Sequence, residues 1–157
     1  MSNNQYTIDS SSLIYGWNTY PPDIFPGIWD HLEALIDKKI IFATDEVRVE
    51  LDKKQDDLHE WVKAQSDFFV PHDIEIQEHV LQVLSNFPGL YDLKKGKSGA
   101  DPFVIAHAIQ NNYTVVTQEG WSNNPDKPKI PNVCKEYDIR CINLLALMRE
   151  KKITLSK

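Results

Sequence analysis

The chain has 157 residues, 41% hydrophobic and 25% charged, which is typical of a single soluble globular domain covering residues 1–157. Because no stretch approaches the roughly 20 apolar residues of a membrane-spanning helix and no secretion signal begins the chain, we expect a cytoplasmic protein without a membrane contact. A net charge of −6 argues against a broad basic surface for nucleic acid, although two divalent cations would cancel four of these negative charges.

Predicted strands alternate with predicted helices along the chain. Short apolar or β-branched runs indicate the strands, and apolar residues recurring every three or four positions indicate the helices. In chain order we predict a strand at 5–8, a helix at 10–16, a proline-rich connection at 20–27, a helix at 28–38, a strand at 39–43, a helix ending at 51, a helix from 56, an extended piece at 68–71, a helix at 73–86, a loop at 91–99, a helix at 100–111, a strand at 113–117, a polar loop at 118–132, a helical turn at 133–137, a strand at 139–142 and a helix at 143–149. This alternation predicts an α/β fold with a central, mostly parallel β-sheet.

Asp9 comes directly after the first predicted strand, where a helix begins. In α/β sheets, ligands collect outside the carboxyl ends of the strands. Asp9 is therefore a candidate site residue, and the neighbouring Ser10 is a candidate supporting hydroxyl. Asp is also among the best helix N-caps, so an ordinary capping role for Asp9 stays open.

Two further acids also lie near the ends of predicted elements. Glu50 precedes the end of the helix that closes at residue 51, although Glu46, one turn earlier, is an alternative. Glu119 follows the strand at 113–117, and Thr117 at the end of that strand is a second supporting hydroxyl. An exposed helix face or the start of a loop explains each acid equally well on its own.

Asp101 begins the predicted helix at 100–111. Ser98 and Asp101 match a capping box, or Asp101 is itself the cap and Pro102 the first helical residue. Neither alternative explains the small residues Gly99 and Ala100, which leave room for a ligand to approach the backbone.

Four carboxylates at one edge of a sheet repel one another unless a cation compensates their charge. Hard oxygen ligands suit Mg²⁺ or Mn²⁺, and such an ion activates water for attack on a phosphodiester. We therefore predict that Asp9, Glu50, Asp101 and Glu119 form a catalytic and metal-binding site.

Four segments together resemble a PIN domain in order and spacing. These are Tyr6–Ser11, Val49–Leu51, Ser98–Ala106 and Val115–Glu119. The chain is similar to the VapC-type toxins of bacterial toxin–antitoxin pairs, and the resemblance extends from Asp9 to about Leu147.

The resemblance implies a PIN-like three-layer sandwich, a Mg²⁺/Mn²⁺-dependent endoribonuclease that cleaves single-stranded RNA, and a cognate antitoxin as partner. A homodimer is the oligomeric state that we consider for this protein. The first three acids of the family correspond to Asp9, Glu50 and Asp101. The fourth, commonly Asp, corresponds to Glu119, which is longer by one methylene group and leaves the position of the metal open.

Basic and aromatic residues near the predicted site are candidates for RNA contact. Lys94, Lys95 and Lys97 precede Asp101, and Lys127 and Lys129 lie in the loop at 118–132. Trp121 in the same loop is a candidate for stacking on a base. Solvated loop lysines are the ordinary alternative.

Two other functions compete with the nuclease. The acidic charge and the Glu at position 119 favour a catalytically weak PIN-like module that acts by binding a partner protein. A phosphotransferase with Asp9 as nucleophile is less well supported, because Ser11 occupies the position where such sites have a second Asp.

Overall fold

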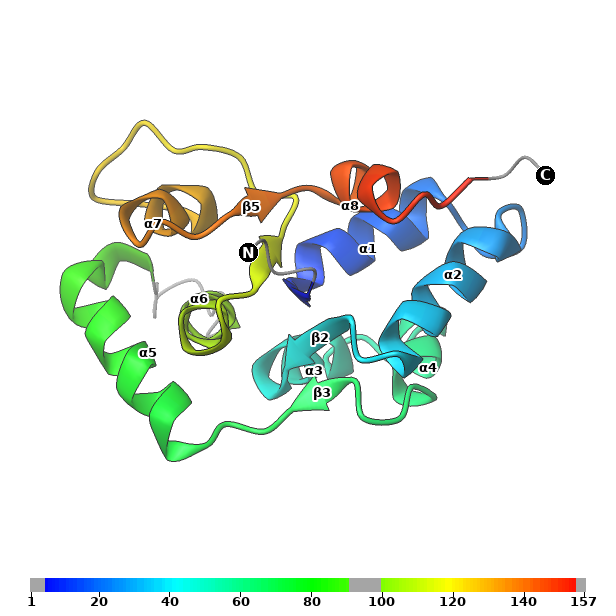
Figure 1. The fold of residues 1–157 in the computed structure, drawn as a ribbon, viewed down its shortest axis with the longest axis horizontal. Helices are drawn as coiled ribbons and strands as arrows, with labels where there is room; N and C mark the ends of the chain where they lie inside the picture. The colour runs from blue at the N-terminus through cyan, green and yellow to red at the C-terminus, as the bar shows by residue number, and fades with distance from the viewer. Residues whose placement is uncertain (1–4, 91–99, 155–157) are drawn as a thin grey trace.

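The computed structural model describes residues 5–90 and 100–154. Helices and strands alternate nearly throughout (Figure 1). In chain order they are β1 (Tyr6–Ile8), α1 (Ser10–Thr19), α2 (Pro26–Asp37), β2 (Ile41–Thr44), α3 (Asp45–Asp52), α4 (Asp57–Lys63), β3 (Phe69–Val70), α5 (Ile74–Asn86), the 3-10 turn η1 (Pro88–Leu90), α6 (Ala100–Asn111), β4 (Thr114–Val116), α7 (Ile130–Glu136), β5 (Cys141–Ile142) and α8 (Leu144–Glu150).

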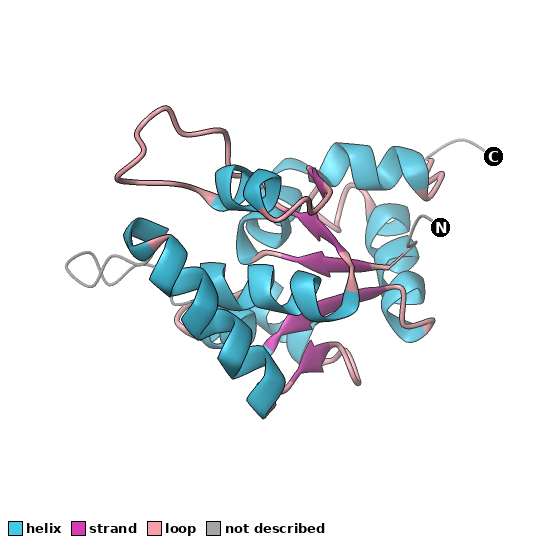
Figure 2. Cartoon of the chain, turned by 60° about the vertical axis from the view of Figure 1, so that its left-hand side comes forward, coloured by secondary structure: helices cyan, strands magenta, loops and turns pink. Residues whose placement is uncertain are grey.

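The described strands form one five-stranded sheet in the order β3-β2-β1-β4-β5, with every neighbouring pair parallel. In Figure 1, α5, α6 and α7 lie on one side of the sheet and α1, α2 and α8 on the other, and Figure 2 shows the strands enclosed between these helices. The predicted α/β class and the three layers around a parallel sheet are confirmed.

The first strand occupies the middle of the sheet. Its neighbours are β2 on one side and β4 on the other, with Ile8 aligned to Val116 of β4. The chain therefore leaves β1 toward one half of the sheet and later returns to build the other half. Ligands of α/β sheets bind at such a reversal of strand order, outside the carboxyl ends of the strands.

Polar side chains define several helix ends as the sequence predicts. Asp56, Asp73 and Asn143 each accept a hydrogen bond from the backbone N–H three residues further on, at 2.8 to 3.0 Å. Asn112 closes α6 with a φ of 55°, a left-handed conformation that Asn tolerates better than most residues.

Two helix boundaries differ from the prediction by three residues. The first helix does not stop at Gly16 but continues to Thr19, and Gly16 instead allows α8 to pack closely, because a Cβ there would lie 2.8 Å from Leu144 Cδ2. The helix predicted at 133–137 begins at Ile130, since Pro131 suits the first turn of a helix.

Three of the four tryptophans pack together between α1, α2 and α4. The Trp29 ring lies edge-on to Trp17 and Trp61, at centroid distances of 4.7 and 4.9 Å, and its indole N–H donates to the Tyr20 carbonyl at 2.6 Å.

None of the described helices is both long and apolar enough to cross a bilayer.

We predict that Gly89→Ala destabilises the protein, whereas Gly27→Ala does not. A Cβ at Gly89 would collide with the backbone carbonyl of Asp126, while nothing lies within 4 Å of a Cβ at Gly27. Overpacking of this kind lowers the free energy of unfolding by about 1–3 kcal/mol, and Ala in α2 raises it by up to about 1 kcal/mol. Urea unfolding of both variants measures the difference; equal stabilities would contradict the close packing at Gly89.

Candidate metal centre

The Asp9 side chain turns from the helix it precedes toward the neighbouring strand. Asp9 occupies the N-cap position of α1, but its carboxylate makes no capping hydrogen bond. Instead, Asp9 Oδ2 accepts hydrogen bonds from Thr117 Oγ1 at 3.0 Å and Ser11 Oγ at 2.7 Å. The capping alternative is therefore wrong for the side chain, and the pairing of β1 with β4 determines where this carboxylate lies.

Ser11 is the supporting hydroxyl that the sequence analysis missed. It donates to Asp9, lies 3.2 Å from Thr117 Oγ1, and accepts the backbone N–H of Gln118 at 3.0 Å. The three consecutive serines after Asp9 were the only signal, and they do not show which hydroxyl turns toward the carboxylate.

Asp9, Asp101 and Glu119 converge, with one carboxylate oxygen of each within 4.8 Å of the others. Because α6 begins at Ala100, Asp101 lies inside its first turn rather than in front of it. Asp9 is 2% exposed and Asp101 9%, whereas Glu119 is half-buried. One Glu119 oxygen accepts the backbone N–H of Ile130 at 3.2 Å, which orients the longer side chain.

Glu50 lies beside this triad, in contact with the supporting serine predicted from the sequence. Ser10 Oγ donates to Glu50 Oε1 at 3.0 Å, and the charge of Glu50 contributes to the raised pKa of Asp9. The backbone N–H of the rival Glu46 donates to His72 instead. These contacts favour Glu50 over Glu46 as the fourth acid.

Burial is the main cause that raises the pKa of Asp9 from 3.8 to about 6. The negative charges of Glu119 and Glu50 add to this effect, and the hydrogen bonds from Ser11 and Thr117 oppose it. A buried carboxylate beside other carboxylates is unfavourable unless a cation compensates its charge.

The donor set fits a hard divalent cation. Three carboxylates offer oxygens from three elements of the fold, and Mg²⁺ prefers oxygen ligands at about 2.0–2.1 Å. The three carboxylate oxygens, which lie within 4.8 Å of one another, could hold one such ion together. The predicted metal site is thus consistent with the geometry of Asp9, Asp101 and Glu119.

The residues predicted to contact RNA fall into two groups. Lys94, Lys95 and Lys97 lie outside the described residues. Lys127 and Lys129 are exposed in the loop between β4 and α7, and Trp121 in the same loop is 54% exposed. Their role in binding stays a prediction.

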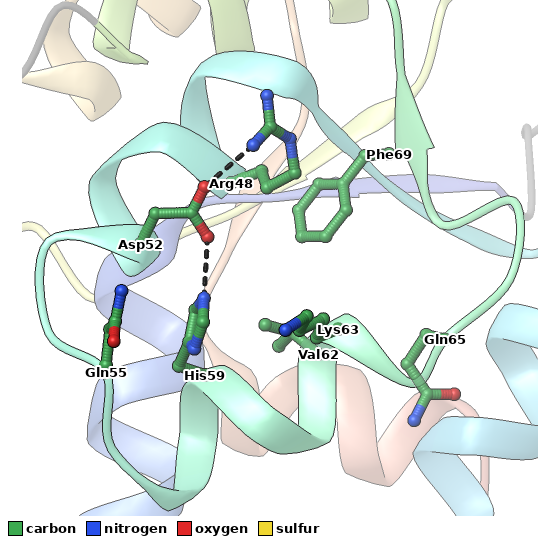
Figure 3. Close-up of a pocket in the computed structure, with 8 residues that line it drawn as sticks. All are labelled: Arg48, Asp52, Gln55, His59, Val62, Lys63, Gln65 and Phe69. Carbon is green, nitrogen blue, oxygen red and sulfur yellow. Dashed lines mark hydrogen bonds and ion pairs between the residues drawn. The ribbon is translucent and has the colours of Figure 1, made fainter.

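A separate hollow of about 370 Å³ lies between α3, α4 and β3 (Figure 3). There Arg48 donates to Asp45 and Asp52, and the other Asp52 oxygen lies 2.8 Å from His59 Nε2. Its main charged groups satisfy one another, and none of the four predicted acids lines it. The lining residues are Arg48, Asp52, Gln55, His59, Val62, Lys63, Gln65 and Phe69.

We predict that, without metal, Asp9→Asn stabilises the protein at pH 7 but not at pH 4. The pKa of Asp9 is about 6 in the folded protein and near 3.8 in the unfolded chain. Between pH 4 and pH 6 the unfolded chain therefore loses the Asp9 proton more readily, and the free energy of unfolding of the wild type decreases as pH rises. The difference between variant and wild type grows by up to about 3 kcal/mol. Urea unfolding with a chelator at several pH values measures it.

The control for this experiment concerns His107, whose pKa burial lowers to about 4. The contribution of His107 to the free energy of unfolding is fully present above pH 6.5 and is lost as pH falls toward 4. This pH dependence is opposite in sign to that of Asp9. The measure is therefore the difference between Asp9→Asn and wild type, in which His107 cancels. A difference independent of pH would contradict the raised pKa of Asp9.

The fold matches solved structures of VapBC proteins at low sequence identity. VapBC2 from Rickettsia felis is 16% identical, with a TM-score of 0.50, over 88% of this chain and 97% of that chain. VapBC from Salmonella typhimurium is 15% identical, with a TM-score of 0.51, over 88% of this chain and 97% of that chain. VapBC-1 from nontypeable Haemophilus influenzae is 13% identical, with a TM-score of 0.51, over 87% of this chain and 95% of that chain. No curated protein matches the sequence.

A family model matches residues 6–155, nearly the whole chain. That match includes all four predicted acids, and the solved structures share the parallel sheet on which three of them converge. The chain therefore belongs to the family described as domain of unknown function DUF4411, and its fold is the PIN-like fold of the VapC-type toxins.

Proposed function

We propose that this protein is a Mg²⁺- or Mn²⁺-dependent endoribonuclease that hydrolyses phosphodiester bonds of single-stranded RNA. The observation that carries the proposal is the convergence of Asp9, Asp101 and Glu119 at the carboxyl end of the sheet. A buried triad of this kind has little structural use, because its mutual repulsion destabilises the fold.

The acids have different tasks in this proposal. Asp9, Asp101 and Glu119 would hold the ion, with Thr117 and Ser11 fixing the direction of the Asp9 carboxylate. Glu50, oriented by Ser10, lies beside the ion site and positions a water at the scissile phosphate. When bound, the ion supplies Lewis-acid stabilisation of the phosphate and lowers the pKa of a water.

The biological setting we propose is a type II toxin–antitoxin pair in the cytoplasm. The solved structures that share the fold include VapBC and FitAB bound to DNA. By this likeness, a cognate antitoxin is the proposed protein partner. Its test is co-purification with the product of a neighbouring small gene.

We predict that Mn²⁺ raises the thermal stability of the wild type but not that of Asp101→Asn or Glu119→Gln. Binding to the folded state stabilises it by about 2.7 kcal/mol when the metal is at 100 times its Kd. Calorimetry and thermal unfolding measure the effect. The matched control is Asp67→Asn, an exposed acid of which the side chain is 81% accessible, and equal stabilisation of all four proteins would contradict the site.

We predict that the wild type cleaves single-stranded RNA only with Mg²⁺ or Mn²⁺. Asp9→Asn and Asp101→Asn should lower kcat by roughly 100-fold or more, because each removes part of the charge that holds the ion. Glu50→Gln should lower it more than Glu46→Gln. The assay follows cleavage of a labelled RNA, with circular dichroism to show that each variant is folded.

The opposite outcome has a defined meaning. If the folded wild type binds metal but cleaves no RNA, the catalytically weak, protein-binding module becomes the better description. If cleavage persists unchanged in both Asp variants, the activity does not belong to this site.

A further inference from the structure

A groove of about 350 Å³ lies beside the candidate metal centre, between the β4–α7 loop and the end of α5. In Figure 1 this loop is the yellow segment that extends above α7. Its lining residues are Phe87, Trp121, Ser122, Asn123, Asn124, Pro125, Pro128, Asn132 and Glu136. A volume near the lower limit of ligand pockets suits a group the size of a single nucleobase.

Trp121 gives this groove an aromatic surface close to the acids. It is 54% exposed and follows the metal-site residue Glu119 by two positions, so their Cα atoms lie within about 8 Å. Lys135 Nζ lies 5.3 Å from the centre of the indole ring, a cation–π contact that restrains the ring. An exposed, restrained indole is a stacking platform for any base.

The groove is preformed because hydrogen bonds hold the loop at both ends. Asn132 Oδ1 accepts the backbone N–H groups of Ser122 and Lys129, and Asn132 Nδ2 donates to the Ser122 carbonyl. The loop also packs against Gly89, where a Cβ would collide with the Asp126 carbonyl. A loop ordered in this way loses little entropy when a ligand binds.

One amide in the groove remains available to a ligand. The polar groups of Asn132 serve the loop, and Asn124 Oδ1 accepts the Asp126 N–H. Within the described part of the chain, the exposed Asn123 side chain makes no hydrogen bond. Its carboxamide presents a donor and an acceptor side by side, the pattern with which Asn recognises the edge of a base.

We propose that this groove binds one unpaired nucleobase of the RNA next to the scissile phosphate, with Trp121 stacking on the base and Asn123 reading its edge. The proposal rests on the nuclease function proposed above and adds to it a residue that determines sequence preference. The exposed Lys127 and Lys129 of the same loop would contribute positive charge for the RNA backbone.

The binding experiment uses the full chain with Asp101→Asn in every protein and a chelator in the buffer, so that cleavage of the RNA is slow on the timescale of the measurement. Fluorescence anisotropy of a labelled single-stranded RNA should show that Trp121→Ala weakens binding about tenfold. Trp121→Phe keeps an aromatic face and should stay within threefold. Leu81→Ala, a control at an exposed apolar residue of α5 (69% exposed), should leave the Kd unchanged.

The cleavage experiment uses the otherwise unaltered chain and a pool of RNA sequences. Asn123→Ala should reduce the preference for one base beside the cut, expressed as the ratio of kcat/KM for RNAs that differ only at that base. Sequencing of the product ends measures this preference. A purely structural role of Asn123 would change stability without changing the preference.

The outcomes separate this proposal from the one on which it rests. If the wild type cleaves RNA but Trp121→Ala binds normally and Asn123→Ala keeps the preference, the subsite is wrong and the nuclease stands. If binding depends on Trp121 but the wild type cleaves nothing, the subsite stands and the nuclease is wrong. No RNA binding by any of the proteins overturns both.

Discussion

The parallel pairing of β1 with β4 is the contact on which the candidate site depends. Ile8 is aligned with Val116, and the Asp9 N–H donates to the Val116 carbonyl at 2.8 Å. The two segments that follow β1 and β4 therefore leave the sheet side by side. This brings Asp9 next to Thr117, which precedes Glu119 by two positions. A shift of one residue in this register would turn Asp9 to the other face of the sheet.

The fold accepts an electrostatic penalty to assemble these acids. Burial and neighbouring carboxylates raise the pKa of Asp9, and hydroxyl groups of Ser11 and Thr117 offset only part of the effect. By contrast, the charged groups around Arg48, in the hollow between α3 and α4, pair with one another. A buried carboxylate whose pKa is raised beside other carboxylates is typical of functional sites, whereas mutually paired charges are typical of a structural ion-pair network.

The loop after β4 connects the acids to the neighbouring groove. Glu119 near its start accepts the N–H of Ile130 at its end, so the same segment that positions a carboxylate also carries Trp121 and Asn123. In the proposed nuclease, metal binding and base recognition would thereby share one ordered element. The sequence of this loop would then tune preference without changing the sheet that holds the acids.

Local sequence signals were sufficient for the alternation of strands and helices, because each element depends on residues close together in the chain, and this alternation in turn predicts a parallel sheet. They also made Asp9, Asp101 and Glu119 candidates together with Glu50, although ordinary capping or surface roles explained each acid on its own. Only the tertiary structure showed that these three converge, that Ser11 rather than Ser10 supports Asp9, and that Gly16 lies inside a helix. Those features depend on contacts between residues as far apart as Ser11 and Thr117, which spacing along the chain does not determine.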